Sequence, residues 1–130
     1  MGTVTSFLRL DRMKVLRHQM QRDSERVRAA LETIQHREEM VAGSVFERRR
    51  RCGKRGCRCE QGKLHVGQIL SVRRAGQPVW TSMNASSSEM TVTLVGNYQR
   101  FRKARRELMQ TFQRLIEAVD ELGCLKLKES

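Results

Sequence analysis

This chain of 130 residues has few aromatic side chains, a single proline and no long apolar run. Aromatic residues make up 5% of the sequence and hydrophobic residues 38%, which argues against a thick globular core. No apolar stretch approaches the roughly 18 residues that a membrane-spanning helix needs, and no N-terminal apolar run resembles a signal peptide. We therefore expect a cytoplasmic protein with no membrane partner.

Acidic residues are also scarce. The chain has 14 Asp and Glu against 26 Lys and Arg, which gives a formal net charge of +12 and an isoelectric point near 10.8. This balance favours nucleic acid or another polyanion as the partner, because crowded cations repel one another unless anions neutralise them. Docking onto an acidic protein is the alternative interpretation.

Patterns typical of enzymes are missing as well. The sequence contains no nucleophile–base pattern and no glycine loop of the kind that cradles phosphates. Glu60 is the only acid within the cysteine-rich stretch that could serve as a base. We therefore expect a protein that is not an enzyme and has no catalytic residue.

Three of the four cysteines are crowded into one short stretch, and a histidine follows. Cys52, Cys57, Cys59 and His65 have the spacing C-x4-C-x-C-x5-H. Three thiolates and one imidazole complete a tetrahedral Zn²⁺ shell, and the glycines between them permit the sharp turns that wrapping one ion requires. Scattered free thiols, a disulfide or redox site and an iron–sulfur cluster are the alternatives. Cys124 lies far away in the sequence and has no assigned role.

Basic side chains surround these four residues, and this arrangement predicts contacts with phosphates. The predicted nucleic-acid-binding residues near the metal ligands are Arg48, Arg49, Arg50, Arg51, Lys54, Arg55, Arg58 and Lys63. Further predicted contacts on the following hairpin and helix are Arg73, Arg74, Arg102, Lys103 and Arg106.

Helix-forming residues dominate both ends of the chain. Residues 1–42 are predicted to form a long helix, with apolar residues seven apart from Met13 to Val41. Residues 85–130 are predicted to form a second long helix and a tail. Apolar residues seven apart from Leu94 to Leu122 form its first row, and Phe112 and Val119 belong to a second row four positions later.

The middle of the chain changes character. Residues 43–66 are predicted to form the basic zinc knuckle, and residues 67–84 a β-hairpin in which 68–73 and 79–83 flank a glycine turn. Trp80 is the only tryptophan. We expect it to anchor a small core beneath the hairpin, and stacking on a nucleic-acid base is the alternative.

These elements predict a mainly α fold, with one domain overall. Two long antiparallel coiled-coil-like helices would be joined by a small zinc knuckle and the β-hairpin. Because neither helix can bury its apolar seam alone, we expect a homodimer or higher oligomer that pairs through the helical seams.

The sequence GSVFER at residues 43–48, followed by Cys52-Gly53-Lys54, Cys57-Arg58-Cys59 and His65, resembles a family of small prokaryotic zinc-knuckle proteins of unknown function. These proteins are encoded near transposases and recombinases of mobile elements. The family pattern has tyrosine at the position of Phe46 and glycine directly after the histidine, where this chain has Val66. The resemblance covers residues 43–83 most closely. It implies a context of mobile DNA and no particular activity.

Two functions fit these observations. The first is a non-enzymatic accessory protein that binds DNA, duplex DNA in preference to RNA, as a helper of a recombinase or transposase. Arginines on a zinc-stabilised head would contact phosphates and position the protein without reading the base sequence. The second is a coiled-coil protein–protein adaptor whose basic head docks on an acidic partner protein.

Overall fold

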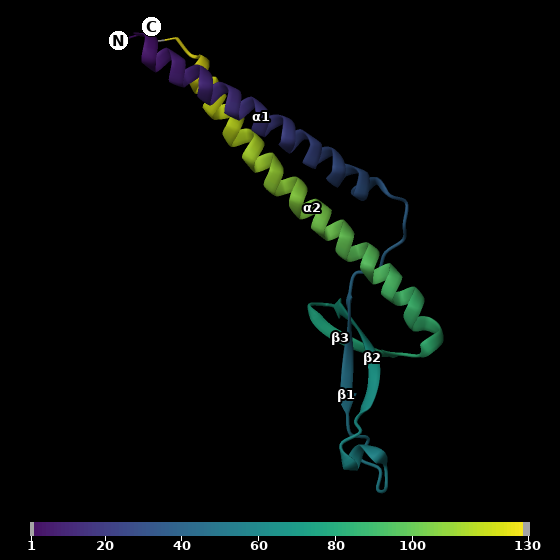
Figure 1. Ribbon diagram of the computed structural model, residues 1–130. Helices are drawn as coiled ribbons and strands as arrows, with labels where there is room; N and C mark the ends of the chain where they lie inside the picture. Colours follow the sequence, from purple (N-terminus) through teal and green to yellow (C-terminus); the bar gives the residue numbers. More distant parts are fainter. Residues whose placement is uncertain (1, 129–130) are drawn as a thin grey trace. The chain divides into compact units, whose positions relative to one another are not determined.

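The computed structural model describes residues 2–128 of the chain, and side chains from residue 6 onward (Figure 1). In chain order the elements are α1 (Gly2–Gln35), β1 (Ser44–Arg50), the 3₁₀ turn η1 (Arg58–Gln61), β2 (His65–Arg74), β3 (Gln77–Met83) and α2 (Ala85–Lys126). They belong to two compact units. The helical unit comprises the residues up to His36 and those from Phe101 onward, and the sheet unit comprises Arg37–Arg100.

The expected fold class, two coiled-coil-like helices joined only by a small knuckle and hairpin, is wrong. A three-stranded antiparallel sheet of order β1-β2-β3 separates the helices in the chain. β1 takes Ser44–Arg50, which were predicted to belong to the knuckle, and it pairs with β2 from Ser44 opposite Ser71 to Arg50 opposite His65. Its sequence signal is weak because Val45 and Phe46 are followed by charged residues. Such residues are common on edge strands, where they discourage pairing with other chains.

Pairing across the sheet decides which side chains share a face, because successive residues of a strand point to opposite sides. Phe46 opposes Ile69, which opposes Ser82, and Ser71 opposes Trp80. We call this side the Phe46–Trp80 face. Its members are Ser44, Phe46, Arg48 and Arg50 of β1, His65, Gly67, Ile69, Ser71 and Arg73 of β2, and Pro78, Trp80 and Ser82 of β3.

The small core of the sheet lies on this face. The rings of Phe46 and Trp80 meet edge to face across β2, with centroids 5.1 Å apart and planes at 70°, and Ile69 is 5% exposed. Trp80 itself is 56% exposed. The tryptophan therefore packs against Phe46 but is not the buried anchor that was predicted from the sequence.

α1 ends at Gln35 and does not continue to residue 42 as predicted. The next residues run along the N-terminal part of α2, within the sheet unit. There the Val41 N–H donates to the Leu94 carbonyl at 3.1 Å, and the Asn97 side-chain amide donates to the Glu39 carbonyl at 2.9 Å. These hydrogen bonds to α2 satisfy backbone groups that a longer α1 would have paired internally.

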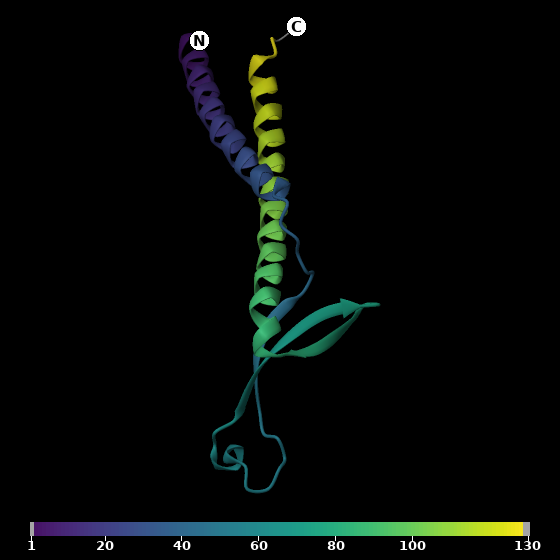
Figure 2. The ribbon, with the colours of Figure 1, turned by 90° about the vertical axis from the view of Figure 1, so that its right-hand side faces the viewer.

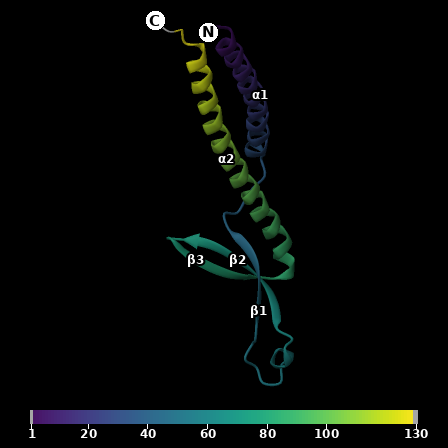
Figure 3. The ribbon, with the colours of Figure 1, turned by 60° about the vertical axis from the view of Figure 1, so that its left-hand side comes forward.

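In the helical unit, α1 runs antiparallel to the C-terminal half of α2 (Figure 3). The Arg12 guanidinium donates twice to the Glu121 carboxylate, at 2.7 and 2.8 Å. The most buried side chains of each helix lie seven residues apart. They are Leu16, Asp23 and Ala30 in α1, and Ala104, Thr111 and Ala118 in α2.

The second apolar row predicted for α2 is wrong. The buried row lies three residues after Phe101 and Leu108 rather than four, and small side chains occupy it. Phe112 and Val119, predicted as seam residues, are 49% and 46% exposed. Together with Met109 and Ile116 they form an exposed apolar stripe on α2, which we call the α2 stripe. Neither helix contains, within residues 2–128, a segment apolar enough to span a membrane.

Candidate metal centre

The four predicted metal ligands lie on the loop between β1 and β2. Because Arg50 at the end of β1 opposes His65 at the start of β2, residues 51–64 leave the sheet and return to it at one place. Figure 2 shows this loop at the end of the two strands, with the turn η1 inside it. Cys52 lies just after β1, Cys57 and Cys59 come from the turn, and His65 is the first residue of β2.

The structure brings the donor atoms of these four residues together. All four lie within 4.8 Å of one another, which confirms that the predicted set could hold a metal ion. The Sγ atoms of Cys52 and Cys59 are 3.5 Å apart, and Cys57 Sγ is 3.1 Å from His65 Nε2. In a tetrahedral zinc site with Zn–S bonds near 2.3 Å, neighbouring sulfurs are about 3.8 Å apart. The donors therefore stand close to the separations that a single bound ion requires.

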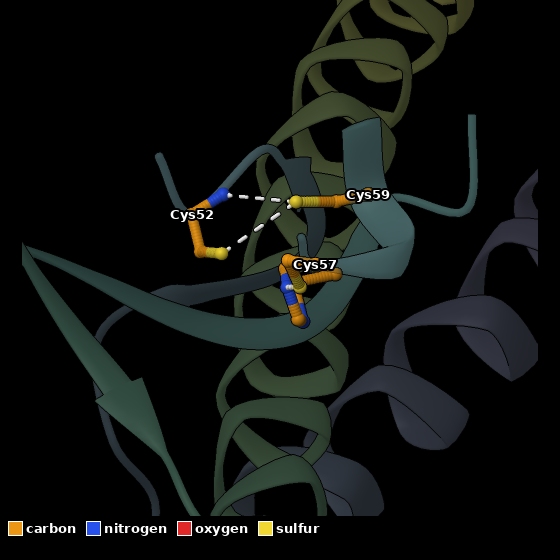
Figure 4. Close-up of side chains that lie close together, drawn as sticks. Cys52, Cys57 and Cys59 are labelled. Atoms are coloured by element: carbon orange, nitrogen blue, oxygen red, sulfur yellow. Dashed lines mark hydrogen bonds between the residues drawn. The ribbon is translucent and has the colours of Figure 1, made fainter. Parts of the chain in front are cut away.

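Side-chain orientation fits a structural metal site, in which only Cys59 of the four residues is buried. Figure 4 shows the thiols of Cys52 and Cys59 pointing toward each other from opposite sides of the loop, with Cys57 close by. The 3.5 Å between their sulfurs exceeds the disulfide bond length of about 2.05 Å, and all four cysteines are free. Cys59 is fully buried, whereas Cys124 is exposed on α2 in the helical unit, outside the cluster.

Local backbone chemistry holds the loop in this shape. Gly62 follows η1 with φ 98°, a left-handed conformation that residues with a Cβ rarely adopt, and its N–H donates to the Cys59 carbonyl at 3.3 Å. Gly56 has φ 78°, and its N–H donates to Glu60 Oε2 at 3.3 Å. Glu60, the only acid of this stretch considered above as a base, therefore supports the turn beside the cysteines.

The two cysteines of the turn differ in acidity. The backbone N–H of Cys59, followed by side-chain hydrogen bonds with Cys52 and His65, lowers the pKa of Cys57 from 9.0 to about 6. The hydrogen bond from the backbone N–H of Cys52 lowers the pKa of Cys59. Burial and the neighbouring thiols raise it by more, so the pKa of Cys59 lies above its ordinary value. The lowered pKa makes Cys57 the readier of these two thiols to ionise, whereas the raised pKa of Cys59 means that a nearby cation would have to favour its thiolate.

The structure brings eight of the predicted nucleic-acid-binding residues together around this loop and leaves five elsewhere. Those on β1 and the loop are all exposed: Arg48, Arg49, Arg50, Arg51, Lys54, Arg55, Arg58 and Lys63. Arg73 and Arg74 lie at the opposite end of β2 from His65, about 30 Å away along the strand at roughly 3.3 Å per residue. The remaining three belong to α2 in the helical unit, and they are Arg102, Lys103 and Arg106.

Sequence reasoning missed how the arginines of β1 are divided between the two faces of the sheet. Arg48 lies on the Phe46–Trp80 face, with its guanidinium carbon 5.8 Å from the centre of the Trp80 ring. Arg49 lies on the other face, 3.6 Å from Glu47. The alternation from Phe46 to Arg50 would have shown this division if the run had been interpreted as a strand.

The chain matches no protein-family model, no curated protein and no solved structure.

Proposed function

We propose that this protein is a non-enzymatic nucleic-acid-binding accessory protein, in which a zinc-stabilised loop presents basic side chains to phosphates. One observation carries the proposal. The loop that gathers three cysteines and a histidine within 4.8 Å also carries five exposed cations, Arg51, Lys54, Arg55, Arg58 and Lys63. Glu60 is the one acid within it, and its carboxylate accepts a backbone hydrogen bond from the same loop.

Zinc is the metal that suits this donor set best. Cys3His shells with four protein ligands are typical of structural zinc sites, whereas a catalytic zinc keeps one position open for water. Bound zinc would supply crosslinking of the loop rather than a reactive centre. The chain's own residues then do the binding: Arg51, Arg55 and Arg58 extend from a backbone whose turns the ligands hold in place.

Duplex DNA is the proposed partner in preference to RNA, and phosphate contacts would position the protein without specifying sequence. The resemblance of residues 43–83 to proteins encoded near transposases and recombinases supports a role as helper of such an enzyme. The loop arginines favour this function because they are exposed and concentrated where the ligands fix the chain.

The first test is metal content and salt-dependent binding. We expect purified protein to contain one zinc per chain, and Cys57→Ser to lose it while Cys124→Ser keeps it. Affinity for duplex DNA should fall linearly on a log–log plot against salt, with a slope of about −0.9 for each phosphate contact. Cys57→Ser should weaken binding and Cys124→Ser should not. Affinity that hardly changes with salt would contradict phosphate contact as the mechanism.

The α2 stripe favours a second function, a protein–protein adaptor. Met109, Phe112, Ile116 and Val119 are each about half exposed or more, at the three- and four-residue spacing of one helix face. The same stripe would serve the predicted self-association into a homodimer or higher oligomer. Charge reversal at Arg50 and Arg55 separates the two functions. It should abolish DNA retention if the protein binds nucleic acid, and it should abolish co-purification with an acidic protein if the protein is an adaptor.

A further inference from the structure

One face of the sheet presents an exposed aromatic ring beside Arg48, with Arg50 two residues further along β1 on the same face. Trp80 is 56% exposed although its indole contacts Phe46 from another strand. Exposing a large aromatic surface to water is unfavourable, and tryptophan is enriched at binding interfaces. The contact with Phe46 is edge to face at 70°, so the two rings are not stacked on one another.

The arginines beside this ring are available to an anion. Within residues 6–128, neither Arg48 nor Arg50 forms an ion pair. The Phe46–Trp80 face carries no acidic residue, whereas Glu47 lies on the opposite face beside Arg49. No acid on this face compensates its positive charge, and the Arg48 guanidinium lies over one side of the Trp80 ring, 5.8 Å from its centre.

A shallow hollow lies beside the two arginines, and Trp80 is not part of its lining. Its volume is about 160 Å³, and Arg48, Arg50, Gly67, Ile69 and Ser82 contribute to its lining. A Cβ built on Gly67 would meet nothing within 4 Å, so the space above this glycine is open. Pockets that enclose small molecules have volumes of roughly 300 Å³ or more. This hollow therefore suits part of an extended ligand rather than a substrate enclosed on all sides.

The combination of a planar exposed ring, adjacent cations and a shallow open surface matches the chemistry of a nucleotide in a single strand. Bases stack on aromatic side chains while arginines follow the phosphates, and this mode tolerates any sequence because every base has a π-face. In a duplex both faces of each base are covered by its neighbours, so a duplex can reach the arginines without occupying the ring. The ring thus distinguishes single strands from duplexes, which the loop cations alone do not.

We propose that the Phe46–Trp80 face binds an unpaired base of a single-stranded nucleic acid, with the base stacked on Trp80 and a flanking phosphate held by Arg48 and Arg50. This inference rests on the proposed nucleic-acid-binding function and names the form of nucleic acid that the sheet accepts. The protein would then bind where strands separate: the metal loop contacts phosphates in general, and the sheet holds an exposed base.

The single tryptophan makes the test direct, because all tryptophan emission comes from Trp80. The full-length, metal-loaded protein is titrated with oligo-dT and with a duplex of equal length. We expect oligo-dT to quench and shift the emission and the duplex to leave it unchanged. Trp80→Ala should weaken oligo-dT binding about 5- to 150-fold, the range for loss of one base stack. Trp80→Phe should retain most of the affinity.

Removing one positive charge at each of three neighbouring positions of β1 provides a control matched for charge. Arg48→Gln, Arg49→Gln and Arg50→Gln each remove one positive charge from β1, but Arg49 lies on the opposite face. We expect the changes at Arg48 and Arg50 to weaken oligo-dT binding several-fold more than the change at Arg49. Equal effects of all three would show general electrostatics and overturn the inference.

The outcomes separate this inference from the function on which it rests. Salt-dependent duplex binding, without any response of Trp80 emission to oligo-dT, would overturn the base platform and leave the proposed function standing. Equal weakening of duplex and oligo-dT binding by Trp80→Ala, with metal content and helix signal unchanged, would also overturn the platform. Absence of binding to either nucleic acid would overturn both.

Discussion

Removal of the metal should unfold the loop and leave the helical unit intact. Ordering residues 51–64 costs on the order of 20 kcal/mol, at about 1–2 kcal/mol of backbone entropy per residue. The backbone hydrogen bonds donated within the loop by Cys57, Glu60, Gly62 and Lys63 return about 1 kcal/mol each. A structural zinc ion in a cysteine–histidine shell supplies about 10–16 kcal/mol. Metal binding would therefore stabilise this folded segment more than its own hydrogen bonds do.

Amide hydrogen exchange measures this directly. After a chelator has stripped the protein, and metal analysis has verified the loss, amides of residues 57–63 should exchange at nearly the rate of an unfolded chain. Peptides from α2 beyond Phe101 belong to the helical unit and should keep their protection. Cys57→Ser should behave like stripped protein, and Cys124→Ser, which changes the one cysteine outside the cluster, should behave like wild type. Protection of residues 57–63 that survives verified metal removal would refute the reasoning.

Three further predictions concern the scaffold. The hydrogen bonds from Arg12 lower the pKa of Glu121. The ionised carboxylate therefore stabilises the fold above pH 4.5, the ordinary pKa of glutamate, and this stabilisation is lost as the pH falls from there through the lowered pKa. Glu121→Gln should flatten the acid dependence of thermal melting. Gly43→Ala should destabilise the sheet by about 1–3 kcal/mol in chemical denaturation, because the new Cβ would lie 2.7 Å from a backbone carbonyl oxygen of β2. Gly96→Ala should instead stabilise α2 by up to about 1 kcal/mol, because alanine is the better helix former. Phe112→Glu should abolish self-association in sedimentation experiments if the α2 stripe mediates it.

Each of these predictions has a matched control or a contradicting result. Arg12→Gln removes the donor of the hydrogen bonds to Glu121 and should flatten the acid dependence as Glu121→Gln does. Equal effects of alanine at Gly43 and Gly96 would contradict the close approach between Gly43 and the sheet. Wild-type protein that sediments as a monomer at high concentration would remove the role assigned to the α2 stripe.

The candidate metal ligands could be predicted from the sequence because they are close together in the chain. Only short segments between Cys52 and His65 separate the candidate ligands. The glycines in these segments have positive φ values, which the turns of the loop require. The convergence of the four donor atoms is confirmed, and the identity of the ion stays a prediction. The burial of Cys59 and the raised pKa of its thiol followed only from the folded turn.

Residue spacing also located the helices but not their contacts. Apolar residues seven apart placed Phe101 and Leu108 on the inner side of α2, where both are half-buried. The small residues Ala104 and Thr111, which lie at the buried positions, carry a weak hydrophobic signal, so the pattern favoured the larger Phe112 instead. Which of two adjacent rows faces the partner helix depends on how closely the backbones approach, and local sequence does not encode that distance.

The sequence by itself determined the candidate ligand set, the positive charge and the two long helical stretches, because composition and short-range spacing control each of them. Only the tertiary structure decided that Ser44–Arg50 is a strand, since its partner β2 lies beyond the metal loop and cross-strand pairing is a long-range interaction. That pairing places Arg48 and Arg50 on one side of the sheet with Trp80 and leaves Arg49 on the other. A run of similar arginines thus acquires two different environments through the alternation of side chains along a strand.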